Sequence, residues 1–495
     1  MSSLDFLKPI IHLLPEIKNP ERPSSLKEKL MWVAFALGLF FIMSNLTAFG
    51  VDTSSTEGLE FLQVITASNI GTLLTTGIGP IVLASIFLQL FNGAGILHFD
   101  MQDPEDKKTF FGVQKLLAII LAIFEGFMFV FLGRIDLISD SFFIQIIVVL
   151  QIAFGSIILL FLDELISKYG IGSGISLFIA ANVSFTVVSG ALSLLGFNNP
   201  NGVLSILQAG GADAIPNAIF YMTPLYFTII VFIIVVYAEG MKVELPLSFG
   251  MAKGVGGRFP IKFLYVSVLP VILTSALLLN IQFLAAVLPA HAQGDTPNGM
   301  DILGSIAWVV NIPKGTNMQG IEEFYPSLQD GFLYLITPTG LSPNPLYTGR
   351  SVFEHWALIA SSSTPIFNIP ELIHLFLYAI IFIILCVIFG KFWVETAGMG
   401  AKDVSSQLQS SGFQIPGFRR DPRAIESVVN KYIPTIVILG SAFVGIIAVL
   451  ADLTGALGTG TGILLTVNIL NKFHEQLTSM NAFDLHPGFG KIFGI

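Results

Sequence analysis

Few side chains within the apolar stretches of this chain could carry out chemistry. Glu125 and Asn280 each lie inside a long apolar run, where an ionisable or amide group is costly and by default marks a functional or paired position. The plainer alternative is a single hydrogen bond between two helices. Cys386 is the one cysteine, so the sequence offers no internal disulfide, and no C-x-x-C motif or Cys/His cluster provides a metal site.

The histidines do not assemble a catalytic set either. They lie mostly in loops or near the ends of apolar runs, and no run combines them with Asp and Ser as a nucleophile needs its base. An enzyme acting within the membrane is therefore disfavoured, and no cofactor is expected. The histidines are His12, His98, His291, His355, His374, His474 and His486.

Bulky aliphatic residues, by contrast, recur beside breaks in the backbone. Gly77 and Gly79 loosen the chain and Pro80 suits the first turn of a helix, while Ile78 and Val82 lie four residues apart on one helical face. A broken helix within a membrane is tolerated only where it is buried in protein or lines a watery cavity. This break therefore predicts a pathway through the protein.

Three further segments repeat the combination of a break and aliphatic residues. Each could hold ordinary core or lipid-facing residues, but four such segments in one chain favour the interpretation that they line the same pathway. The three are the glycines of 170–174 before Ile175 and Ile179, Pro270 before Val271 and Ile272, and the glycines of 455–462 before Ile463, Leu464 and Leu465.

The composition requires a membrane around these segments. Apolar residues make up 53% of the chain, charged residues 12%, and the mean hydropathy is +0.79, whereas soluble domains carry about 25% charged residues. We expect an all-α polytopic membrane protein with ten transmembrane helices in two pseudo-symmetric halves of five; the symmetry follows from the span count alone. The expected spans are 30–50, the broken 58–91, 111–132, 142–162, 171–195, 218–238, 261–288, 372–394, 432–450 and 456–470.

Lysine and arginine set the orientation of these spans, because cytoplasmic loops hold the excess of positive charge. All of the 24 Lys and Arg residues except Arg134, Lys314 and Arg350 fall on one side of the predicted membrane. Both termini are therefore expected in the cytoplasm. The even number of spans agrees with this assignment.

The span positions divide the chain into segments. The first residues could form an amphipathic surface helix or an ordinary polar lead-in. The basic, glycine-containing cytoplasmic loops could dock on RNA phosphates, although the positive-inside rule produces such loops anyway. The expected parts are a cytoplasmic N-terminus (1–29), the N-terminal half (30–197) with a polar segment at about 57–70, an outside connection (198–217), the C-terminal half (218–474) with an outside segment (290–364) and cytoplasmic loops (240–262 and 395–431), and a cytoplasmic tail (475–495).

Several stretches together resemble the SecY family, the large subunits of protein-conducting channels. Their sequences are most similar to those of its archaeal branch. The resemblance covers nearly the whole chain apart from the long outside segment. The matching stretches are Ile65–Leu73 running into Gly77–Val82, Leu162–Glu164 followed by Lys168–Ile175, Val235–Glu239, Pro260–Phe263, Phe392–Thr396 and Gly455–Leu465.

The resemblance implies a plug and a pore ring. The polar half-helix would be the plug, and a ring of aliphatic side chains would form the narrowest point of the channel. Flexible apolar side chains can seal around a passing chain and, when narrow, exclude ions by dewetting. The implied plug residues are Glu60, Phe61, Gln63, Ile65, Thr66, Ala67, Ser68, Asn69 and Ile70, and the implied ring is Ile78, Val82, Ile175, Ile179, Ile272 and Leu465.

A lateral gate between spans two and three and spans seven and eight is also implied, with a polar cluster at Glu125 and Asn280. Its third member is a hydroxyl residue in relatives, but Leu83 stands there in this chain. The cytoplasmic loops would dock the ribosome and could contact its RNA. The implied docking residues are Lys253, Arg258, Arg419 and Arg420, while Met251 replaces an arginine of relatives.

The resulting expectation is the pore subunit of a Sec translocon in the cell membrane. It would act as a passive channel for unfolded secretory polypeptides and release transmembrane segments sideways into lipid. Its implied partners are small SecE/gamma-type and beta-type subunits, the ribosome, signal peptides and nascent chains. The alternative from the residues alone is a small-solute transporter, which would place charged groups at the central break.

Overall fold

The computed structural model describes most of the predicted spans. The described residues are 9, 11, 14–22, 25–52, 69–93, 95–97, 99, 103–131, 135–139, 141–197, 202–211, 214–249, 256–286, 290–291, 308–316, 322–336, 352–364, 368–410, 413–414 and 422–485. Side chains at 245–249, 256–258, 279–280, 282–286 and 422–424, among others, are outside that description.

Within the described residues, a helix lies on each of the ten predicted spans. The N-terminal half contains α2 (Leu26–Asn45), α4 (Gly79–Gly93), α5 (Pro104–Phe131), α6 (Phe142–Tyr169) and α7 (Gly174–Leu195). The C-terminal half contains α10 (Thr223–Gly240), α11 (Leu269–Ala286), α16 (Glu371–Thr396), α18 (Pro422–Leu453) and α19 (Gly460–Leu485).

Six of the described helices are long and apolar enough to cross a membrane by length and composition, namely α5, α6, α7, α10, α16 and α18. The helices at 79–92 and 269–278 are apolar but shorter. For 79–92 this agrees with the half-span expected after the break at Gly77–Pro80. The chain is a multi-pass membrane protein.

The seventh helix begins later than predicted. The apolar run was expected to be helical from Ile261, but β4 (Gly256–Lys262) ends the preceding hairpin and α11 starts only at Leu269. Pro270 is the second residue of α11, where its missing N–H costs no helical hydrogen bond. Ser267 before it has a positive φ of 60°, which separates the turn from the helix. Hydropathy alone does not mark this boundary.

Short sheets occupy the connections between helices. Strand β3 (Lys242–Phe249) pairs with β4 and with β8 (Phe413–Gln414), and so joins the two basic loops into one sheet. On the opposite side, β6 (Trp308–Thr316) pairs with β7 (Glu322–Asp330) and with β5 (Ala290–His291). The smallest sheet joins β1 (Val51–Asp52) to β2 (Asp136–Leu137).

Five shorter helices lie in the described parts of the connections. α8 (Val203–Ala209) and α9 (Ala214–Tyr221) precede α10, and α17 (Ala401–Ser410) packs against α18. α13 (Phe332–Leu335) and α15 (Val352–Ser361) both pack against α16.

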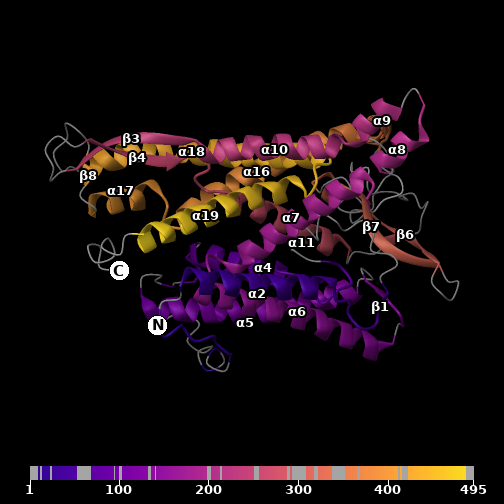
Figure 1. Ribbon diagram of the computed structural model, residues 1–495, viewed down its shortest axis with the longest axis horizontal. Coiled ribbons are helices and arrows are strands. Elements are labelled where there is room, and N and C mark those ends of the chain that lie inside the picture. The colour runs from indigo at the N-terminus through magenta and orange to yellow at the C-terminus, as the bar shows by residue number, and fades with distance from the viewer. Residues whose placement is uncertain are drawn as a thin grey trace.

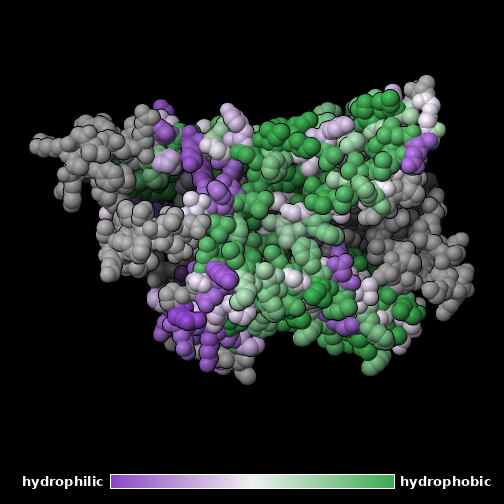
Figure 2. Space-filling view, viewed as in Figure 1, coloured by the Kyte–Doolittle hydropathy of each residue, from purple (hydrophilic) through white to green (hydrophobic). Residues whose placement is uncertain are grey.

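Two groups of helices enclose the core. Figure 1 shows α2, α4, α5 and α6 on one side, α10, α16, α18 and α19 on the other, and α7 and α11 between them. A single hydrophobic cluster runs through both groups. Within it, the buried rings of Phe40 on α2 and Phe178 on α7 stack with centroids 5.1 Å apart. Figure 2 shows a broad hydrophobic belt, with hydrophilic residues concentrated toward one end of the molecule.

Residues 15–17 are tied to α5 and α6. Glu164 on α6 accepts from Lys115 Nζ at 2.8 Å, from Lys168 Nζ at 2.9 Å and from the Ile17 backbone N–H at 3.1 Å. Lys115 also donates to the Pro15 carbonyl at 2.5 Å. We call this group, Lys115, Glu164 and Lys168 with residues 15–17, the N-terminal strap. It joins the first half of α5 to the end of α6.

Candidate functional site

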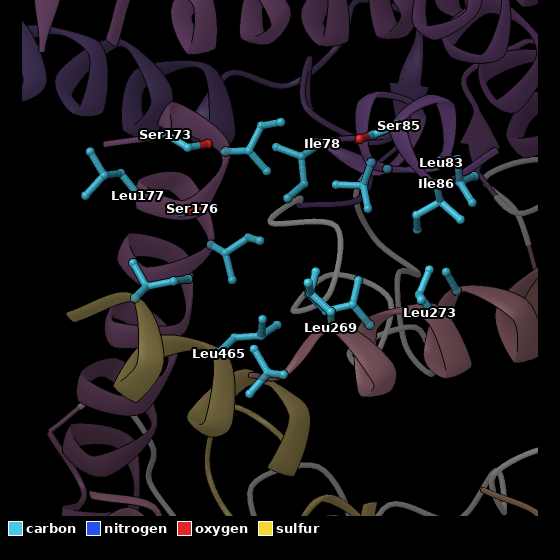
Figure 3. Close-up of a pocket in the computed structure, with 18 of the residues that line it drawn as sticks. Ile78, Leu83, Ser85, Ile86, Ser173, Ser176, Leu177, Leu269, Leu273 and Leu465 are labelled. Atoms are coloured by element: carbon cyan, nitrogen blue, oxygen red, sulfur yellow. The ribbon is translucent and has the colours of Figure 1, made fainter. Parts of the chain in front are cut away.

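A cavity of about 450 Å³ lies between the two groups of helices. It is lined by residues of α4, α5, α7, α11, α16 and α19 and of the turns that precede α4, α7 and α11. All six residues of the expected ring border it: Ile78, Val82, Ile175, Ile179, Ile272 and Leu465. Figure 3 shows Ile78, Leu269 and Leu465 arranged around this space from the starts of α4, α11 and α19.

The ring positions differ in how far they are covered. Ile78, Ile179 and Leu465 are 1%, 5% and 4% exposed, so neighbouring side chains cover them almost completely. Val82, Ile175 and Ile272 are half-buried and pack against the same hydrophobic cluster. The part of the cavity that these six residues line is therefore aliphatic.

The start of α4 is held by a serine on α6. The Ser156 hydroxyl donates to the Gly77 carbonyl at 2.9 Å, and its oxygen lies 2.6 Å from the Thr76 hydroxyl oxygen. Gly77 has a φ of 53°, a conformation that glycine adopts without a steric penalty. Ile78 follows immediately, so this contact fixes the backbone from which the first ring residue projects.

The start of α7 is held by an aspartate on α6. Asp163 Oδ1 accepts from the backbone N–H of Ile175 at 2.9 Å and from the Ser173 hydroxyl at 3.3 Å. The first N–H groups of a helix have no partner within it, so an acceptor from outside satisfies one of them. Here the capped residue is itself a ring residue.

The start of α19 repeats this arrangement. Asp452 Oδ1, near the end of α18, accepts from the backbone N–H of Gly460 at 2.7 Å. The preceding turn is held as well, since the Leu457 N–H donates to the Thr228 hydroxyl of α10 at 2.8 Å. Leu465 projects from the second turn of the helix that begins there.

The start of α11 is arranged differently. Thr274 donates to the Pro270 carbonyl of its own helix at 2.8 Å, and its hydroxyl lies 3.4 Å from the Cys386 sulfur on α16. The contact that α16 makes with α11 is thus a weak thiol interaction, and it lies one turn inside α11 rather than at its start.

Polar residues border the cavity outside the aliphatic ring. Glu125 and Leu83 of the expected gate line it. Asn280 is a residue of α11, but its side chain lies outside the described part of the chain. Farther along α19 than Leu465, Asn468 donates to Glu239 at 3.0 Å, and Lys472 also lines the cavity. Burial lowers the pKa of Lys472, which lies beyond the predicted span.

The remaining expected residues fall largely outside the described chain. Of the plug, only Asn69 and Ile70 are described; Asn69 donates to the Ser44 carbonyl at 2.9 Å, and Ile70 is buried against the α5–α6 pair. Glu60, Phe61, Gln63, Ile65, Thr66, Ala67 and Ser68 lie outside it, as do Lys253, Met251, Arg419 and Arg420. Arg258 is a backbone member of β4, and its side chain is not described.

Sequence reasoning missed Ser156, Asp163 and Asp452. A signal existed for the aspartates, because each precedes a glycine run that opens the next helix. Ser156 had no such signal, since its partner at Gly77 lies 79 residues away in the chain.

Comparison with known proteins identifies the family of this fold. The family model for SecY matches residues 72–474. The chain belongs to the SecY family. A SecY protein, the protein translocase subunit of Methanocaldococcus jannaschii, is 42% identical over 98% of this chain and 99% of its own length. The SecY subunit of Pyrococcus furiosus is 37% identical over the full length of both chains.

Solved structures of SecY relatives agree in fold. A structure described as a protein-conducting channel superposes with a TM-score of 0.74 at 40% identity, covering 98% of this chain and 99% of its own. Sec61 in a canine ribosome–channel complex from the endoplasmic reticulum superposes with a TM-score of 0.72 at 38% identity, covering 98% and 99%. The resemblance to SecY and to its archaeal branch, and with it the ten-helix fold, is confirmed.

Proposed function

We propose that this SecY-family chain is the central pore subunit of a Sec translocon. It is a passive channel that moves unfolded secretory polypeptides across the membrane and releases transmembrane segments sideways into lipid. The observation that carries this is the convergence of six aliphatic residues, from four separate backbone breaks, on one cavity. A hydrophobic core alone does not require four helices to begin beside one cavity.

The physical role of the ring follows from its side chains. Isoleucine, valine and leucine cannot hydrogen-bond water, so a narrow constriction of them excludes water and ions by dewetting. They bind no particular sequence and can shift between rotamers, so they allow polypeptides of any composition to pass. No bond is made or broken, which fits a transport role rather than an enzymatic one.

A sideways exit fits the helices around the cavity. α4 packs against α5 and α16, and the cavity is bordered by α4 and α5 on one side and α11 on the other. Glu125 lines the cavity at this boundary between α4–α5 and α11. Because Leu83 stands where relatives have a hydroxyl residue, this boundary is more apolar in this chain. We expect Glu125 and Asn280 to supply the polar contact across it.

The proposed partners follow from the relatives. One neighbour is a ribosome-bound channel, and we assign ribosome docking in this chain to the sheet formed by β3, β4 and β8, which unites the two basic loops. Lys253, Arg258, Arg419 and Arg420 would make the contact. Small SecE/gamma-type and beta-type subunits, signal peptides and nascent chains complete the set. The protein would lie in the cell membrane with both termini in the cytoplasm.

Ion conductance of the reconstituted full chain tests the ring. Replacing Ile175 and Ile179 with serine places hydroxyl groups at the constriction, so water and ions enter and the resting conductance rises. The matched control replaces Val188 and Leu192, which have the same spacing on α7 and are 59% and 42% exposed. Unchanged conductance of the ring variant, with normal assembly, would contradict the proposed function.

A further inference from the structure

We propose that Ser156, Asp163 and Asp452 are positioning residues that hold the pore ring closed. Each forms what we call a latch: Ser156 to Gly77, Asp163 to Ile175, and Asp452 to Gly460. Each latch ties the start of one ring-bearing helix to a neighbouring helix. This inference rests on the proposed function, because it assumes that the ring is the seal.

The latches act at the glycine-containing turns through which the chain enters three of the ring-bearing helices. A glycine-containing break precedes each of α4, α7 and α19, and the first N–H groups of a helix lack partners within it. Asp163 and Asp452 each accept from one such N–H, whereas the Ser156 hydroxyl donates to the Gly77 carbonyl just before α4. For Asp163 and Asp452, the carboxylate also faces the positive end of the helix dipole.

The distance from latch to ring is short in each case. Gly77 is the residue before Ile78, and Ile175 is both the capped residue and a ring residue. Leu465 lies five residues after Gly460, a little more than one turn. A displaced helix start therefore displaces the ring side chain by nearly the same amount.

Close backbone contact supports each latch. A Cβ added to Gly155, beside Ser156, would lie 1.8 Å from the Leu73 carbonyl oxygen. One added to Gly174 would lie 2.6 Å from the Asp163 Cα, and one added to Gly460 would lie 2.2 Å from the Ala448 carbonyl oxygen. The helices thus approach closely enough for a short serine or aspartate side chain to reach the neighbouring backbone.

Two of the latches come from a helix that does not face the cavity. The residues that line it in the described chain come from α4, α5, α7, α11, α16 and α19 and the turns beside them, whereas Ser156 and Asp163 belong to α6. These side chains cannot touch a polypeptide in the cavity directly. Their influence on the seal passes through the helix starts they hold.

Resting ion conductance and thermal stability of the full chain, purified with its membrane partners, test this inference. We expect Asp163→Ala, Asp452→Ala and Ser156→Ala each to raise the conductance about fivefold, the effect of losing a typical cap for the aspartates and a typical hydrogen bond for the serine. Asp163→Asn and Asp452→Asn keep an acceptor oxygen and should restore conductance close to that of the unsubstituted chain. This rescue separates positioning from a general loss of stability.

The matched control is Asp103→Ala. Asp103 Oδ1 accepts from the Glu105 N–H at 3.3 Å at the start of α5, so it caps its own helix without reaching a neighbour. We expect no change in conductance. Ser156→Ala removes one oxygen and keeps every carbon, so it tests the inference even where an aspartate variant does not fold.

The outcomes separate this inference from the proposed function. Folded latch variants with unchanged conductance, beside a leaking Ile175→Ser/Ile179→Ser variant, would overturn the inference and leave the seal in place. A ring variant that does not leak would overturn the proposed function and the inference with it.

Discussion

Gly155→Ala should destabilise the protein although it adds a single methyl group. The new Cβ would lie 1.8 Å from the Leu73 carbonyl oxygen and 2.8 Å from the carbonyl carbon, and both are backbone atoms that cannot rotate away. To restore van der Waals contact, α6 and the segment before α4 must separate by about 1.5 Å, and overpacking of this kind costs about 1–3 kcal/mol. The same shift would stretch the Ser156–Gly77 hydrogen bond.

Gly38→Ala is the matched control, because it lies within α2 and a Cβ there meets nothing within 4 Å. An alanine at an unobstructed helical position stabilises by about 0.4–1 kcal/mol through the unfolded state. The two substitutions are chemically identical, so their opposite effects on the free energy of unfolding isolate the contribution of packing.

The buried thiol of Cys386 provides the assay. It is 0% exposed and is the one cysteine of the chain, so a thiol-reactive dye labels the protein only as it opens. We expect Gly155→Ala to label at a lower temperature than the unsubstituted chain and Gly38→Ala at an equal or higher one. Gly155→Ala labelling at or above the unsubstituted temperature would refute the reasoning.

Two further predictions concern the ends of the molecule. Glu164→Gln leaves Lys115 without its carboxylate and Lys168 paired with Glu16 alone, so we expect trypsin to cleave after Lys18 about fivefold faster. An unchanged cleavage rate would mean that the N-terminal strap is held by other contacts. Arg419→Glu reverses a charge in the second basic loop, so ribosome affinity should fall and the loss should shrink at high salt; affinity that holds at physiological salt would assign docking elsewhere.

The sequence predicted the helices and the aliphatic lining well because both depend on local pattern. Apolar runs located the spans, and glycine or proline beside isoleucine located the breaks at Gly77–Pro80 and at 170–174. The start of the seventh helix was wrong, because a hydropathy pattern does not distinguish an apolar strand from a helix end. Val243, Leu245 and Leu247 alternate with other residues, which was a strand signal that Pro246 obscured.

The Ser156 latch could not be predicted from pattern, because it joins residues 79 positions apart that only the folded arrangement brings together, whereas the two aspartates lie 12 and 8 residues from their partners. Ser156 resembles any serine in a transmembrane helix, where a hydroxyl commonly bonds to its own backbone. Its role depends on Gly155 beside it, which admits the Leu73 carbonyl, and this contact is a property of two helices rather than one.

Two of the latches, Ser156 and Asp163, belong to the same helix, α6, so the spacing of residues along α6 constrains the positions of two ring-bearing helices. Ser156 and Asp163 are seven residues apart, so they share one face and stand about 10 Å from each other along the axis. That interval sets how far apart α4 and α7 begin. One inserted residue between them would swing one side chain by about 100° away from its target, so the count of residues there is as constrained as their chemistry.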